Sequence, residues 1–230
     1  MDHDALARRF VEDRFPAAEA AVLAGSTARG ERTATSDVDL LVLGPAQMFD
    51  ADEDSLAATL AFEGEAFEVF AHTAGAFERW VEKDLARHRP LLLNMLFEGR
   101  PVRAGALLDR LRDRWSPVRD AGPRVEPHEL DMRRYIVTDV VDDLRDATDP
   151  LERRVLAATL FERLGELLLV SHGEWIATGK HLPRRLRAWD PVRTERLSAP
   201  LLADDHAGLV AAAEVELEAL GGRLQADFTR

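Results

Sequence analysis

The spacing of apolar and polar positions changes its period several times along the first half of the chain. Residues 3–15 have helical spacing, with Leu6, Phe10 and Val11 on one side. Short apolar runs bounded by Gly, Pro and charged residues are typical of strands. The pattern predicts strands at about residues 20–24, 37–44 and 66–71, a helical segment that begins at residue 25, and helices over residues 52–62 and 77–98. Strands that alternate with helices indicate an α/β unit.

The second half of the chain has helical periodicity. Helices are predicted at residues 128–146, 149–173 and 201–220. The stretch "SPVRDAGPRVEP" at residues 116–127 contains three prolines and a glycine, and is the best linker candidate. The predicted fold class is therefore α+β. An α/β domain with a small mixed sheet is expected over residues 1–120, and an α-helical bundle over residues 121–230.

Two aspartates stand at the head of the second predicted strand. Side chains alternate along a strand, so Asp37 and Asp39 point to one face of the sheet. Val38, Leu40 and Val42 point to the other face, which would pack on helices. Two carboxylates so close raise each other's pKa unless a cation lies between them. A divalent ion relieves this repulsion, and Mg²⁺ is the usual ion where phosphate is also a ligand.

The turn before these aspartates has the composition of an anion site. Gly25 lets the backbone approach a ligand closely. The hydroxyl groups of Ser26 and Thr27, with N–H groups at the start of the next helix, favour an anion, and Arg29 adds a positive charge. A lone Gly-Ser turn or a lone Asp-x-Asp is more often structural. Their occurrence together between two apolar strands favours a site for a nucleoside triphosphate and its magnesium ion.

The stretch "GSTARGERTATSDVDLLV" resembles the signature of the DNA polymerase beta-like nucleotidyltransferase superfamily, in which Gly-Ser is followed after ten residues by Asp-x-Asp. Ser36 fits the usual residue before the first aspartate, and Arg29-Gly30 is similar to the pattern in small bacterial members. The resemblance extends over about the first hundred residues when the α/β context is included. It indicates the superfamily and leaves the substrate open.

The resemblance implies a third carboxylate on a later strand, facing the other two. Residues 66–71 are the natural place, and Glu68 is the expected residue because Glu65 has the opposite parity at the strand's entrance. An exposed glutamate on an edge strand is the alternative interpretation. His72 has the same parity as Glu68, but a lone histidine is more often structural.

Two-ion chemistry then predicts the roles of these carboxylates. One Mg²⁺ or Mn²⁺ ion, bound by Asp37, Asp39 and Glu68, would lower the pKa of an acceptor hydroxyl. A second ion, bound by Asp37 and Asp39, would hold the triphosphate and stabilise the leaving pyrophosphate. Catalysis would consist chiefly of positioning and charge compensation, with ATP as the expected nucleotide.

The helical half contains the segment "SHGEWIATGKHLPRRLRAWDP", which brings Trp175, Lys180, Arg184 and Trp189 together in sequence. Lys180 and Arg184 are expected to contact the triphosphate, and a tryptophan would stack on a base or sugar. A packed tryptophan with a solvated basic loop is the alternative. The architecture loosely resembles bacterial antibiotic nucleotidyltransferases of the kanamycin and lincosamide type, which implies a small-molecule acceptor such as an aminoglycoside-like antibiotic.

An acidic strip runs along the helix predicted at residues 128–146. If the strip faced the predicted active site, it would attract a polycationic acceptor, and one of its aspartates would serve as general base toward the acceptor hydroxyl. Facing solvent, it is a charged surface. Its members are spaced along one side of the helix: Asp139, Asp142, Asp143 and Asp146.

Composition removes several classes of function. The chain has no cysteine, which excludes disulfides, thiolate metal sites and cysteine nucleophiles. No apolar run reaches the roughly 18 residues of a membrane helix, and the first residues lack the apolar core of a signal peptide. We therefore expect a cytoplasmic protein with no membrane partner. The net charge of −12 disfavours electrostatic capture of nucleic acid by the whole chain.

Two other classes of function stay open. The same chemistry on a nucleic-acid 3′-hydroxyl or on a protein side chain would use the basic stretches at residues 100–124 and 180–196. A non-catalytic, antitoxin-like binder is the third class, although the intact pair of aspartates argues against it. The antitoxins of this superfamily pair with HEPN-type ribonucleases, whose signature is an arginine followed after four to six residues by a histidine. That spacing does not occur in this sequence, so the chain is not such a ribonuclease fused to its antitoxin. A homodimer is also left open.

Overall fold

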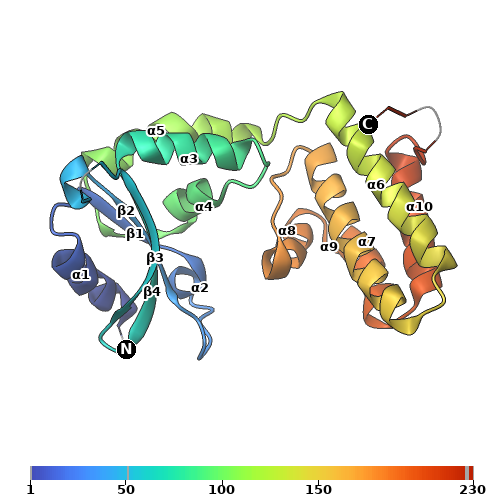
Figure 1. The fold of residues 1–230 in the computed structure, drawn as a ribbon, viewed down its shortest axis with the longest axis horizontal. Helices are drawn as coiled ribbons and strands as arrows, with labels where there is room; N and C mark the ends of the chain where they lie inside the picture. Colours follow the sequence, from blue (N-terminus) through green and yellow to red (C-terminus); the bar gives the residue numbers. More distant parts are fainter. Residues whose placement is uncertain (1, 51, 226–227, 230) are drawn as a thin grey trace. The chain divides into compact units, whose positions relative to one another are not determined.

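Five strands form one mixed sheet in the first half of the chain in the computed structural model, which describes residues 2–50, 52–225 and 228–229 (Figure 1). The strand order is β3-β4-β2-β1-β5. Strands β2 and β4 are parallel, and the other neighbouring pairs are antiparallel. The strands are β1 (Ala20–Leu23), β2 (Val38–Leu43), β3 (Ser55–Phe62), β4 (Glu65–His72) and β5 (Arg100–Arg103). The chain divides between Ala121 and Gly122 into two compact units.

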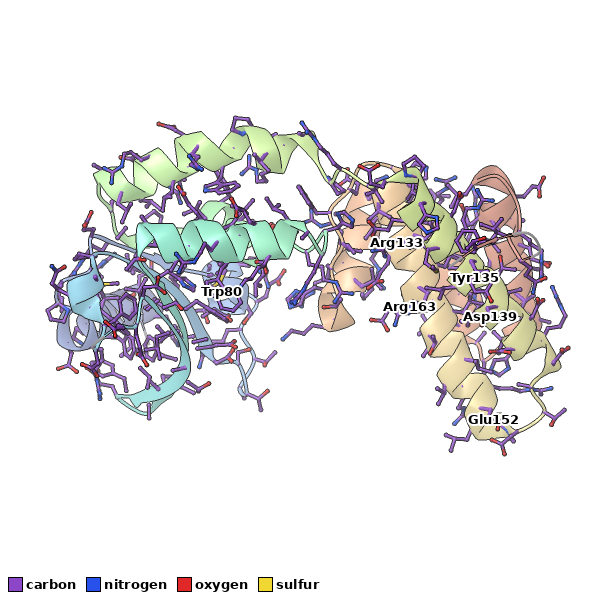
Figure 2. All side chains as sticks on the ribbon, turned by 45° about the horizontal axis from the view of Figure 1, so that its top comes forward. Trp80, Arg133, Tyr135, Asp139, Glu152 and Arg163 are labelled. Carbon is purple, nitrogen blue, oxygen red and sulfur yellow. The ribbon has the colours of Figure 1, made fainter. Side chains whose placement is uncertain are left out.

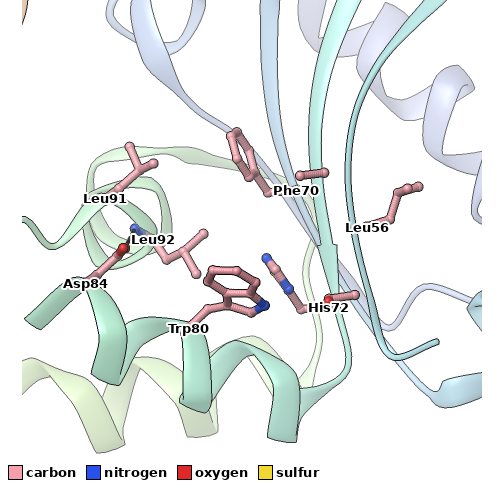
Figure 3. Close-up of a pocket in the computed structure, with 9 residues that line it drawn as sticks. Leu56, Phe70, His72, Trp80, Asp84, Leu91 and Leu92 are labelled. Carbon is pink, nitrogen blue, oxygen red and sulfur yellow. Dashed lines mark hydrogen bonds between the residues drawn. The ribbon is translucent and has the colours of Figure 1, made fainter. Parts of the chain in front are cut away.

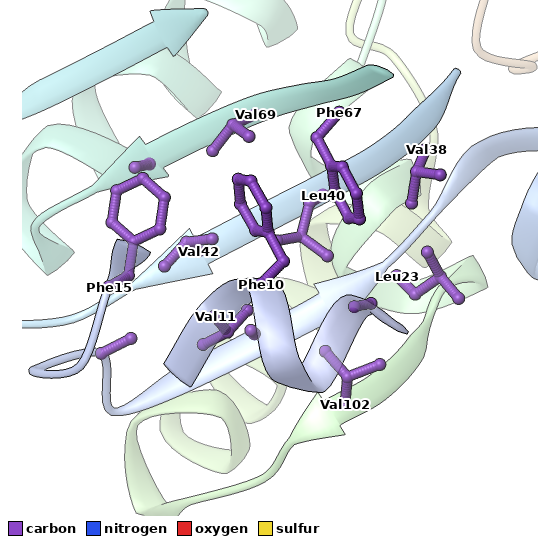
Figure 4. Close-up of a cluster of buried hydrophobic side chains, with 14 of the residues drawn as sticks. Phe10, Val11, Phe15, Leu23, Val38, Leu40, Val42, Phe67, Val69 and Val102 are labelled. Carbon is purple, nitrogen blue, oxygen red and sulfur yellow. The ribbon is translucent and has the colours of Figure 1, made fainter. Parts of the chain in front are cut away.

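Helices cover both faces of this sheet. Helix α1 (His3–Arg14) packs on one face, and α3 (Ala74–Leu85), α4 (Leu91–Glu98) and α5 (Ala106–Ala121) lie over the other (Figure 1). On the α1 side, Phe10 stacks on Phe67 with 4.1 Å between ring centroids, over Val38, Leu40 and Val42 (Figure 4). The predicted apolar face of the second strand is thereby confirmed.

Residues 55–62 form strand β3, where a helix over residues 52–62 was predicted. Strand β3 pairs with β4 through a turn in which both Glu63 and Gly64 have positive φ, 47° and 86°. Leu56, Leu60 and Phe62 have the same parity and pack on the α1 side of the sheet. The prediction was wrong because Ala and Leu favour helices intrinsically, whereas the two-residue turn and the period of two dictate a hairpin.

The helix predicted over residues 77–98 is two helices, α3 and α4. His88 adopts a left-handed φ of 55° and Pro90 precedes α4, so the helical hydrogen bonding stops between them. Helix α5 also continues through Pro117 to Ala121, which shortens the predicted linker to the residues that follow. Strand β5 and helix α5 lay outside the sequence-based prediction.

The second unit is the predicted helical bundle, and the fold class α+β is confirmed. Residues 201–220 are not one helix, because α9 ends at Leu202 and α10 starts at His206. Inside the bundle, Glu166 is buried, and the Nη1 atoms of Arg133 and Arg163 lie 3.6 and 3.5 Å from its Oε2. Figure 2 labels the two arginines, which come from α6 and α7. The helices are α6 (Pro127–Asp146), α7 (Pro150–Ser171), α8 (Leu182–Trp189), α9 (Pro191–Leu202) and α10 (His206–Ala219). Among the described residues, no helix combines the length and apolar character needed to cross a membrane.

Candidate active site

Three carboxylates meet at the start of the parallel strand pair. Asp37 directly precedes β2, Asp39 is its second residue, and Glu68 lies beside Asp39 in the register of β2 and β4. One ligand oxygen from each carboxylate lies within 4.8 Å of the other two, and all three residues are partly exposed. Parallel register and alternation thus bring together the residues that the sequence singled out, and no other such group occurs among the described residues.

The three carboxylates perturb one another electrostatically. Burial raises the pKa of Glu68, and the nearby charges of Asp37 and Asp39 raise it further, with a hydrogen bond to Asp39 acting in the same direction. Proximity of like charges in a partly desolvated site disfavours the fully ionised state. The oxygen donor set is suited to a hard divalent cation, which would relieve this repulsion.

Gly25 fits against the carboxylate of Asp39 in a way that no other residue could. It has a left-handed φ of 61°, and a Cβ atom built on it would lie 1.7 Å from Asp39 Oδ2. The N–H of Ala24 donates to the carbonyl oxygen of Asp39 at 2.9 Å, which fixes the turn to β2. The glycine therefore permits close approach of the loop to the Asp39 carboxylate.

The backbone of Asp37 is held by two side chains of the preceding loop. Thr27 Oγ1 donates to the carbonyl oxygen of Asp37 at 3.2 Å, and Arg32 Nη1 donates to the same oxygen at 3.0 Å. Arg32 Nη2 also forms an ion pair with Glu65 at the start of β4. Arg32 thus ties the loop to both strands that carry the carboxylates. Arg32 could not be recognised from the sequence, because no pattern distinguishes it from any other arginine in a polar loop.

The other predicted residues of the loop, Ser26, Arg29 and Ser36, differ in their contacts and exposure. The backbone N–H of Thr33 donates to Ser36 Oγ at 2.9 Å, so Ser36 closes the turn before Asp37. Arg29 is exposed at the end of α2 (Gly25–Arg29), with its Nε 3.0 Å from Glu31 Oε2. Ser26 is partly exposed next to Gly25. Their predicted contacts with a nucleotide remain predictions.

Lys180 and Arg184 belong to the second unit, and both side chains are exposed. Trp175 is buried, and Trp189 packs against His172 with 4.8 Å between ring centroids. The packing of both tryptophans agrees with the structural alternative for this segment. Contact of the two cations with a triphosphate stays a prediction.

The acidic strip on α6 is partly neutralised. Asp142 binds Arg145 and Arg223, and the Arg223 hydrogen bond lowers the pKa of Asp142. Asp139, Asp143 and Asp146 are exposed. An attraction for cations would therefore arise from these three residues.

Comparison with known proteins identifies the first unit. Residues 5–113 match the nucleotidyltransferase domain family, which confirms the resemblance of this part of the chain to the DNA polymerase beta-like superfamily. The match supports a nucleoside triphosphate as substrate and the transfer of a nucleoside monophosphate. The match includes all three clustered carboxylates.

Other comparisons add less. No curated protein matches the chain. Among solved structures, a nucleotidyltransferase-like protein from Exiguobacterium sibiricum is similar, with a TM-score of 0.48 and 12% identity over 94% of this chain and 75% of that one.

Proposed function

We propose that this chain transfers a nucleoside monophosphate from a nucleoside triphosphate, with ATP as the expected donor, to a hydroxyl group of a small molecule. The single observation that carries the proposal is the cluster of Asp37, Asp39 and Glu68 beside Gly25, within a nucleotidyltransferase domain. An aminoglycoside-like antibiotic is the acceptor class that we favour.

The carboxylates would hold the divalent ions, Mg²⁺ or Mn²⁺. Asp37 and Asp39 are expected to bind both ions, and Glu68 is expected to bind only the ion nearer the acceptor. When bound, such ions offset the charge of the polyphosphate and favour the ionised acceptor hydroxyl. Burial raises the pKa of Glu68, and the charges of Asp37 and Asp39 raise it further. The repulsion among the carboxylates supports this assignment, because a bound cation would relieve it.

The loop around these carboxylates would position the donor. Gly25 leaves room at the Asp39 carboxylate. The Ser26 hydroxyl and the Arg29 guanidinium follow Gly25 in sequence, and we expect them to bind phosphate oxygens. Thr27 and Arg32 hold the Asp37 backbone in place, so that its carboxylate does not have to be ordered when substrate binds.

The contacts of the first basic stretch favour a small acceptor over nucleic acid. Several arginines between residues 100 and 124 are engaged within the protein rather than displayed for phosphates. Arg100 pairs with Asp4, Arg103 donates to the Ala18 carbonyl, and Arg112 donates to that of Leu96. Nucleic-acid affinity depends on cations that are available to phosphates.

A labelled-nucleotide transfer assay tests the proposal. The chain would be incubated with labelled ATP and Mg²⁺ or Mn²⁺ and offered aminoglycosides, a primed oligonucleotide or no acceptor other than itself. We expect label on the small molecule, and loss of transfer in Asp39→Asn, which keeps the shape but removes a charge at the cluster. Asp109→Asn, the same change on the exposed side of α5, is the matched control.

The other outcomes identify the alternatives. Label on the oligonucleotide would assign polymerase-like transfer, and label on the protein would assign transfer to a side chain. Undiminished transfer by Asp39→Asn would disprove the role of the cluster. Nucleotide binding without transfer to any acceptor would favour the antitoxin-like class.

A further inference from the structure

A hollow of about 200 Å³ lies in the first unit between the edge strand β3 and helices α3 and α4 (Figure 3). Its walls are mainly apolar side chains, and a cavity of about 150 Å³ with such a lining is large enough to hold benzene. It faces the same side of the sheet as Glu68, farther along β4. The apolar side chains that line it on this face of the sheet are those of Ala57, Phe70, Trp80, Leu91 and Leu92.

His72 is the unusual residue of this hollow. Its side chain is 4% exposed, and neither ring nitrogen has a hydrogen-bond partner within the protein. Figure 3 shows the ring between Trp80 and Phe70, with its nitrogens toward the space that these residues line. An imidazole buried without partners costs free energy that a ligand offering a hydrogen bond would recover. Burial also lowers the pKa of His72 to about 4, so the ring is neutral and presents one donor and one acceptor.

The rim of the hollow is apolar and accessible. Trp80 is 42% exposed and Leu91 52% exposed, which makes them two of the large hydrophobic side chains that this unit displays to solvent. Lys83 Nζ lies 4.1 Å from the centroid of the Trp80 ring, a contact that orients the indole. Asp84 accepts a hydrogen bond from the N–H of Leu92 at 3.1 Å, so this carboxylate caps α4.

We propose that this hollow is a second binding site, which takes a small planar heteroaromatic molecule whose ring nitrogen exchanges a hydrogen bond with His72 while its face packs on Trp80. A flat ring matches the size and the apolar lining of the hollow. A nitrogen at the edge of that ring would form a hydrogen bond with the unpaired imidazole of His72. The site is separate from the carboxylate cluster and does not depend on the proposed transfer reaction.

Benzimidazole is a suitable probe because it is flat and carries one N–H donor and one bare nitrogen. The chain has four tryptophans, so a ¹H–¹⁵N spectrum resolves the side-chain N–H of Trp80 from the others, with Trp80→Phe to assign it. We expect benzimidazole to shift the Trp80 signal in a saturable manner, and not those of Trp115, Trp175 and Trp189. In His72→Phe the dissociation constant should rise about fivefold, the value of one hydrogen bond.

Three comparisons make the result decisive. Toluene, which has no polar edge, should bind equally to the wild type and to His72→Phe. Trp80→Ala changes a side chain that is 42% exposed and should weaken the binding of both probes, which in this variant is followed by the backbone N–H signals of β4 and α3. Asp39→Asn should bind benzimidazole as the wild type does. The proposal is overturned if the Trp80 signal does not respond, if His72→Phe binds benzimidazole as tightly as wild type, or if Asp39→Asn abolishes binding.

Discussion

Replacing Gly25 with alanine tests how closely the loop and the Asp39 carboxylate, the proposed metal ligand, depend on each other. The new methyl group would lie 1.7 Å from Asp39 Oδ2 and 2.5 Å from its Cγ. Real Cβ atoms essentially never approach a neighbour more closely than 3.0 Å. The carboxylate would therefore have to withdraw by about 1.3 Å, or the loop would have to leave β2.

Two effects add up in this variant. A left-handed backbone at an L-residue costs about 1–2 kcal/mol, which lowers the free energy of unfolding. Displacement of a positioning group by about 1 Å costs about 100-fold in rate, because the ions and the reacting groups are no longer aligned. We therefore expect Gly25→Ala to lose about 100-fold in nucleotide transfer and to bind Mn²⁺ more weakly.

Gly64→Ala separates the two effects. Gly64 has a φ of 86° in the β3–β4 turn, and nothing lies within 4 Å of the position that a Cβ would occupy. This control incurs the backbone cost without the collision. In urea unfolding both variants should lose the stability that corresponds to the backbone cost, and Gly25→Ala should lose more because of the collision. Gly25→Ala alone should lose Mn²⁺ affinity in calorimetry and transfer in the labelled-nucleotide assay.

Equal activity and Mn²⁺ affinity in the two folded variants would refute this reasoning. That result would mean that Asp39 can move without consequence, or that its observed position is not the one used for binding ions.

Three further predictions concern charge. In EDTA-treated protein, the raised pKa of Glu68 makes stability fall as pH rises above 4.5, so Glu68→Gln should raise the melting temperature at about pH 7 more than at about pH 4. Because the pKa of His72 is lowered from 6.5 to about 4, the folded state binds its proton less readily than the unfolded chain does, so stability falls as the pH is lowered from 6.5 to about 4. Urea unfolding should show that His72→Phe removes up to about 3 kcal/mol of this dependence. Arg32→Leu removes the hydrogen bond to the Asp37 carbonyl and the ion pair with Glu65, and should cost about 1–2 kcal/mol and weaken Mn²⁺ binding in calorimetry, with Arg32→Lys intermediate.

The carboxylate cluster could be predicted because strand geometry is a local property. Alternation along β2 puts Asp37 and Asp39 on one face whatever the rest of the chain does. Glu68 required one more assumption, that its strand lies next to β2, and parallel pairing satisfies it by placing Glu68 opposite Asp39. Gly25 also followed from the sequence as a residue of close approach, although the atom that it approaches did not.

Features that depend on distant partners could not be predicted in this way. Residues 55–62 consist largely of Ala, Leu and Thr, so their strand conformation is decided by hydrogen bonds to β4 and by packing on α1. The role of Arg32 depends on Glu65, which lies 33 residues away in sequence. Neither interaction produces a periodic pattern.

The same distinction explains why the class of reaction is better defined than its acceptor. Nucleotidyl transfer needs a few groups at fixed separations, and two neighbouring strands bring three carboxylates together within a single unit. Selection of an acceptor depends on shape and on groups from several elements, among which we expect the acidic side chains of α6. These side chains belong to the other unit, whose hydrophobic core is separate from that of the sheet. We therefore expect that changes on α6 can alter the choice of acceptor while the carboxylate cluster stays constant.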